Sequence, residues 1–109
     1  MLETDYKFGE VHVLANQVES GADRVHVKSI FSTSNGGVAL VAFKAGQALD
    51  THVTPAEVMV TVLEGEVEFT ILDAVHHLKA GEFLLLGAEV PHSVKAPVDA
   101  KLMLAKIKA

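Results

Sequence analysis

The sequence predicts an all-β domain, a sandwich or a barrel, and three observations support this prediction. Several segments alternate apolar and polar residues with a period of two, which is typical of half-buried strands. Short apolar segments recur with turn residues between them, at a spacing of roughly eight to twelve residues. No segment shows the periodicity of an amphipathic helix. Together these patterns favour many short strands packed around one core.

The first half of the chain predicts two strands joined by a hairpin turn. Patterning is weak at the N-terminus, where residues 11–14 suggest a short strand and residues 16–21 a polar loop. Residues 24–32 alternate valines with polar residues, as a half-buried strand does. Asn35-Gly36 follows, a pair that supplies the positive φ angles of a tight hairpin turn. The return strand over 38–44 is almost wholly apolar.

The second half predicts a succession of short strands separated by glycine-containing turns. In Glu66–Leu72, Val67, Phe69 and Ile71 share one face, while the glutamates and Thr70 share the other. The last predicted strand ends in lysines, which would protect an exposed sheet edge. The predicted strands cover residues 58–63, 66–72, 75–78, 83–86, 92–96 and 101–108.

Composition narrows the class of protein. The 109 residues suffice for one domain, and half of them are hydrophobic, which favours a homodimer that buries more apolar surface. The chain has no cysteine, so disulfides, thiolate nucleophiles and cysteine-based zinc sites are excluded. With a net charge of −5 and scattered basic residues, we expect no nucleic-acid partner. Apolar runs are too short to span a membrane, and the N-terminus lacks a secretory pattern, so we expect a cytoplasmic protein.

Two stretches carry a resemblance to a known family. Each contains a glycine, an extended segment and a histidine, and in one barrel the two histidines would meet inside. Gly46 and His52, with Glu64-Gly65 at the close, resemble the first motif of the cupin superfamily, and Gly81 with Val90–His92 resembles the second. The resemblance covers roughly residues 25–107. It implies a double-stranded β-helix, a small jelly-roll barrel that is commonly dimeric. We expect a single cupin domain over residues 1–109, with residues 1–22 as an N-terminal arm and residues 25–107 as the barrel.

The resemblance also implies a divalent metal, iron, manganese, nickel or zinc, held by three imidazoles and one carboxylate. Here Thr54 and Val58 stand where the family has its second histidine and its glutamate, so only His52 and His92 match. Glu57 precedes the carboxylate position by one residue, and strand alternation would point it outward. A bulge or turn after Pro55 would re-aim Glu57 and complete a two-histidine, one-carboxylate site suited to Fe(II). Otherwise the two histidines are hydrogen-bonded remnants of such a site.

Three functions remain open on this sequence, and it does not decide whether the chain is an enzyme. The first is binding of a small organic molecule in a pocket lined by His52, Thr54, Val58, Val60 and His92. The second is a metal-dependent enzyme of the dioxygenase, isomerase or decarboxylase type. The third is a structural dimer module with a vestigial pocket. Of the other histidines, we expect His76 and His77 at the surface and His26 in solvent.

Overall fold

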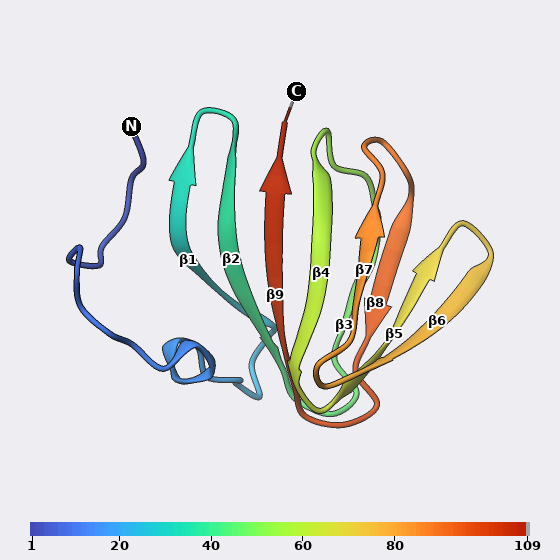
Figure 1. Cartoon of the computed structure of the whole chain (residues 1–109). Coiled ribbons are helices and arrows are strands. Elements are labelled where there is room, and N and C mark those ends of the chain that lie inside the picture. Colours follow the sequence, from blue (N-terminus) through green and yellow to red (C-terminus); the bar gives the residue numbers. More distant parts are fainter. Residues whose placement is uncertain (109) are drawn as a thin grey trace.

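Two antiparallel β-sheets make up most of the molecule in this computed structural model, which describes residues 1–108 (Figure 1). The larger sheet contains, in spatial order, β1 (His26–Thr33), β2 (Gly36–Phe43), β9 (Ala100–Ile107), β4 (Glu57–Glu64) and β7 (Phe83–Leu86). The smaller sheet contains β3 (Ala48–His52), β8 (His92–Lys95), β5 (Glu66–Ile71) and β6 (Ala74–Lys79). The predicted all-β jelly roll is confirmed. No helix within residues 1–108 has the length and apolarity needed to cross a membrane.

The main core lies between the two sheets. In β4, Val58, Val60 and Val62 are buried, while the residues between them are half-buried or exposed. In β5, Val67 and Phe69 point inward in the same way. This alternation is the period-two pattern read from the sequence, because successive strand residues face opposite sides of a sheet. The core is completed by Val41, Phe43, Ala56, Leu78, Leu86, Val94, Ala96, Ala100 and Leu102.

Strand β2 is apolar along most of its length because both of its faces are covered. Val41 and Phe43 face the main core. Leu40 and Ala42 face the opposite side, where they pack with Val18 of the N-terminal arm in a second, smaller core. A strand that is buried on both faces shows no polar alternation.

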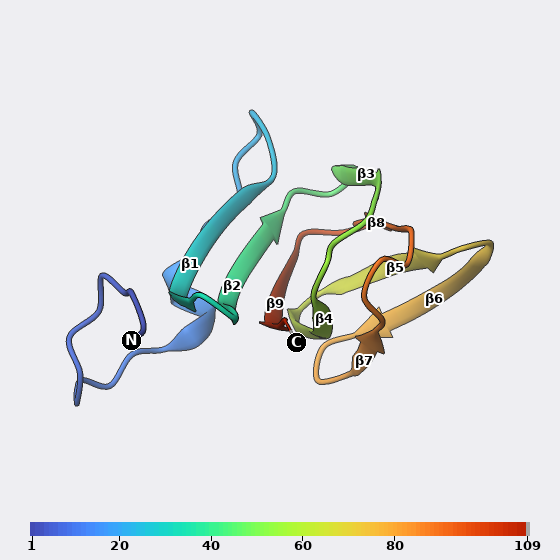
Figure 2. The same ribbon diagram turned by 90° about the horizontal axis from the view of Figure 1, so that it is seen from above.

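The N-terminal arm contains no strand at residues 11–14, so that sequence prediction is wrong. A short 3-10 helix, η1 (Leu14–Gln17), begins there instead. Val11 and Val13 are exposed, so their apolar character reports no buried strand. The Nζ of Lys101 donates a 2.6 Å hydrogen bond to the carbonyl of Ala15 and ties η1 to the larger sheet. Viewed from above, the arm runs outside β1 and β2 (Figure 2).

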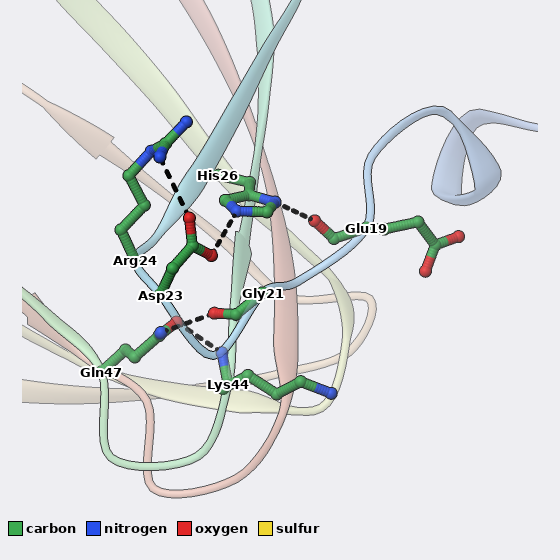
Figure 3. Close-up of polar contacts among 7 residues, drawn as sticks. All are labelled: Glu19, Gly21, Asp23, Arg24, His26, Lys44 and Gln47. Carbon is green, nitrogen blue, oxygen red and sulfur yellow. Dashed lines mark hydrogen bonds and ion pairs between the residues drawn. The ribbon is translucent and has the colours of Figure 1, made fainter.

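Polar contacts fasten the end of the arm to the barrel (Figure 3). His26 Nδ1 lies 2.9 Å from the carbonyl oxygen of Glu19, and His26 Nε2 lies 2.9 Å from Oδ1 of Asp23. Because both partners are acceptors, the ring satisfies both contacts when it carries two protons. The hydrogen bond from His26 lowers the pKa of the Asp23 carboxyl. His26 therefore anchors the arm, and its side chain is 34% exposed, so it is partly solvated and not free in solvent.

The predicted hairpin between β1 and β2 is present, but its turn lies at Ser34-Asn35 and not at Asn35-Gly36. Gly36 is already the first residue of β2, with φ 152°. A Cβ atom at Gly36 would lie 1.9 Å from the carbonyl oxygen of Lys106. The glycine is therefore required by the close approach of β9.

Strand β9 is not an edge strand, so the predicted role of its lysines in edge protection is wrong. It lies between β2 and β4 and pairs with both of them in antiparallel register (Figure 1). Whether a lysine of β9 points into the barrel or away from it therefore depends on the face of the strand on which it lies.

Candidate functional site

A pocket of about 250 Å³ opens between the two sheets. Its wall is mostly aliphatic, with one phenylalanine and a small number of polar side chains. Such a composition is typical of small-molecule sites, in which few polar groups fix the orientation of the ligand. The lining residues are Val41, Leu49, His52, Val53, Thr54, Val58, Val60, Phe69, Leu86, His92, Val94, Leu102, Leu104 and Lys106.

A bulge in β3 turns His52 toward this pocket. Leu49 pairs with Val94 and His52 pairs with His92, so β3 uses three steps where β8 uses two. Leu49 and His52 both line the pocket. In a regular strand, residues three apart would face opposite sides. The extra residue restores the inward direction of His52, as bulges beside functional sites commonly do.

The two histidines lie against each other although they belong to different strands. Their ring centroids are 4.2 Å apart, and the ring planes are inclined by 59°. His92 is buried and stacks almost parallel on Phe69, with centroids 5.6 Å apart and an interplanar angle of 6°. His52 is exposed at the opening of the pocket. The pair therefore consists of one buried imidazole, His92, which is held by stacking, and one solvent-accessible imidazole, His52.

Both imidazoles are held in the same tautomer by the same local contact. Nδ1 of His52 lies 2.8 Å from the carbonyl oxygen of Asp50, and Nδ1 of His92 lies 2.9 Å from that of Val90. A carbonyl can only accept, so each Nδ1 carries the proton. In a neutral imidazole this leaves the lone pair on Nε2, which can accept a hydrogen bond or bind a metal.

All five residues expected in the pocket line it together: His52, Thr54, Val58, Val60 and His92. Val58 and Val60 are buried and form part of the apolar wall. Thr54 is half-buried, and its carbonyl accepts a 2.8 Å hydrogen bond from the amide of Glu89. That contact joins the loop after β7 to the segment that follows His52. Thr54 therefore lines the same pocket as the histidine pair.

Glu57 lies outside the pocket. It is exposed on β4, whereas the next residue, Val58, lines the cavity. The pairing of β4 with β9 is regular here, with Glu57 opposite Ile107 and Val58 opposite Lys106, so no bulge re-aims the glutamate. Among residues 1–108, no three His, Asp or Glu side chains are grouped so that they could hold a metal. The donor set of two imidazoles does not fit the site of three histidines and one carboxylate that the resemblance implies.

Lys106 is a pocket residue that sequence reasoning missed. It lies on β9 and lines the pocket with Leu102 and Leu104. The alternation places residues 102, 104 and 106 on one face of a strand, but it does not tell whether that face is the inward one. The expectation of an edge strand concealed the position of Lys106.

The fold and the pocket define a small jelly-roll domain with an apolar cavity and two inward histidines. The sequence model of the cupin domain family matches residues 39–107, so the chain belongs to that family. An RmlC-like cupin protein from Desulfovibrio desulfuricans is 31% identical, with a TM-score of 0.79, and the match covers 90% of this chain and 95% of that one.

Two further solved structures share the fold at lower identity. A protein of unknown function from Streptococcus pyogenes has a TM-score of 0.89 at 23% identity, over 97% of this chain and 93% of the other. A cupin superfamily protein from Desulfitobacterium hafniense has the same TM-score at 16% identity, over 97% of both chains. Comparison with curated proteins finds no match.

Proposed function

We propose that this cupin domain binds a small organic molecule in the pocket around His52 and His92. The observation that carries the proposal is the pairing of a mostly apolar cavity of about 250 Å³ with two imidazoles whose Nδ1 atoms are already engaged. That volume is roughly eight times the share of one water molecule in the liquid. A ligand of this size would bury its apolar part against the valines and leucines of the wall.

The two imidazoles would fix the orientation of the ligand in the pocket. Each Nε2 can accept a hydrogen bond from a hydroxyl or an N–H of the ligand, because its own ring proton is donated to a backbone carbonyl. The contact of His92 with Phe69 holds one acceptor in place before the ligand arrives. A preorganised acceptor adds affinity because less conformational freedom is lost on binding.

A metal-dependent enzyme of the dioxygenase, isomerase or decarboxylase type is the alternative. It is favoured by the same two Nε2 atoms, since carbonyl-held imidazoles are typical metal ligands. Among residues 1–108, only two such groups line the pocket, and Glu57 lies outside it. A structural role without ligand is the third possibility. One set of variants separates the three.

The test compares two matched histidine pairs. The first variant carries His52→Ala and His92→Ala. The control carries His76→Ala and His77→Ala, two exposed residues on β6 that lie outside the pocket. Untagged proteins are screened against a panel of small organic compounds by ligand-observed NMR. Their metal content is measured by elemental analysis, before and after dialysis against a chelator.

A binding domain predicts compounds that bind the wild type and the control but not the pocket variant, with no bound metal in any of them. Stoichiometric metal that is lost only in the pocket variant supports the enzyme alternative. If no compound binds and no metal is present, the proposal fails and the structural reading stands. His52→Ala alone keeps the buried ring of His92, so it provides a folded variant if the double variant unfolds.

A further inference from the structure

The charge of the pocket is opposite to the charge of the protein. The chain has a net charge of −5. Of the residues 1–108, those that line the pocket include His52, His92 and Lys106, but no aspartate or glutamate. A cavity with a single permanent charge and apolar walls concentrates the field of that charge. The pocket therefore attracts anions although the molecule as a whole repels them.

Lys106 has no carboxylate partner in the part of the chain that the structure describes. The lysines that form ion pairs among residues 1–108 are Lys28, Lys44 and Lys101. Its cross-strand neighbours are Gly37 on β2 and Val58 on β4, neither of which carries a charge. The ammonium group is thus available to a ligand.

Three of the four polar side chains of the pocket lie toward solvent, and the fourth, His92, is buried. His52 and Lys106 are exposed and Thr54 is half-buried. The interior of the cavity is lined by buried apolar side chains such as Phe69 and Leu102. This gradient suits a molecule with two different ends: an anionic group that remains near the opening and an apolar body that enters the cavity.

We infer that the pocket selects small organic anions, carboxylates with a compact apolar body, and that Lys106 is the residue that recognises their charge. This inference rests on the proposed function, and it names the class of ligand. The carboxylate would pair with the Lys106 ammonium, while a ligand hydroxyl donates to a histidine Nε2. The geometry gives Lys106 a specificity role, because an uncharged analogue fills the same space without the ion pair.

The test uses salicylate and its uncharged analogue salicylamide as probes. Both present the same aromatic ring with an ortho hydroxyl, and only salicylate carries a full negative charge. Each is titrated into the wild type, Lys106→Met, Lys106→Arg and Lys79→Met, and binding is followed by NMR. Lys79→Met removes the same charge from an exposed position outside the pocket. We expect the wild type and Lys79→Met to bind salicylate about tenfold more tightly than salicylamide.

Lys106→Met should remove that preference and leave salicylamide binding unchanged, and Lys106→Arg should retain it. Raising the salt concentration should weaken salicylate binding alone, since the ion pair lies at an exposed opening. Equal affinity for the two probes, or a preference that survives Lys106→Met, overturns the inference while the proposed function stands. Absence of binding by both probes at millimolar concentration also overturns it, and the compound panel then decides separately on the proposed function.

Discussion

His52 and His92 are cross-strand partners on β3 and β8, and their ring centroids lie 4.2 Å apart. The two rings nevertheless have different surroundings. His92 is buried and stacks on Phe69, whereas His52 is exposed at the opening of the pocket. One pair therefore combines a residue that supports the core with a residue that is free to meet a ligand.

We predict that the two histidines contribute unequally to stability. His92→Ala removes the stacking on Phe69 and a donor to the Val90 carbonyl, and should lower the free energy of unfolding by about 2 kcal/mol. His52→Ala should change it by less than about 0.5 kcal/mol, because an exposed ring buries little surface. Urea unfolding followed by circular dichroism measures both values. Equal losses would contradict the assigned division of roles.

Gly36→Ala should be among the most damaging substitutions outside the core. The added Cβ would lie 1.9 Å from the Lys106 carbonyl, so β2 and β9 must separate locally. We expect a loss of roughly 3 kcal/mol in the free energy of unfolding. Gly81→Ala is the control, because Gly81 has φ +89° but open space around it, and should cost roughly 1–2 kcal/mol for backbone strain alone. A Gly36→Ala protein as stable as Gly81→Ala would show that the strands relax easily.

The anchor between Asp23 and His26 should make stability depend on pH in the acid range. The hydrogen bond from His26 lowers the pKa of Asp23 from its usual 3.8, so the carboxylate adds stability above pH 3.8. That stability is lost as the pH falls through the lowered folded value. Asp23→Asn should therefore flatten the dependence of unfolding free energy on pH around and below pH 3.8. Asp73→Asn, in the exposed turn between β5 and β6, should leave the dependence as in the wild type.

A homodimer is expected through the outer face of the larger sheet. The strand registers align an apolar row across all five strands, which comprises Phe31, Val38, Ala105, Met59 and Leu85. Leu85 is 72% exposed in a single copy. Multi-angle light scattering should give a dimer for the wild type and a monomer for Leu85→Glu, since a charge in an apolar interface is costly. Val75→Glu, at an exposed position on the other sheet, should remain dimeric. A monomeric wild type rules the interface out.

The strands that the sequence predicted well are those with a covered face. In β4 and β5 the apolar alternation matches the buried side chains, because burial of one face selects for it. The strand predicted at residues 11–14 was wrong because valine usually indicates a buried strand, whereas Val11 and Val13 are exposed here. In the site, the motif histidines were found because their spacing resembles that of the family.

Two features of the site were beyond sequence patterns. The bulge before His52 depends on how β3 aligns with β8, and pairing across the sheet is not encoded locally. The inward position of Lys106 required knowing that β9 lies between β2 and β4. A terminal lysine at a strand end usually indicates a solvated edge. Partner strands, more than residue types, determine both side-chain directions.

The central place of β9 has a consequence for synthesis of the protein. Strands β2 and β4 leave the ribosome well before residues 100–107, yet each of them needs β9 as a hydrogen-bonding neighbour. Until β9 has been synthesised, the nascent chain has two unpaired strand edges, on β2 and β4, that can pair with other chains. The larger sheet cannot close co-translationally from its early strands alone. We therefore expect expression yield to depend on how soon β9 inserts, and a chain stalled before residue 100 to be a substrate for chaperones or proteases.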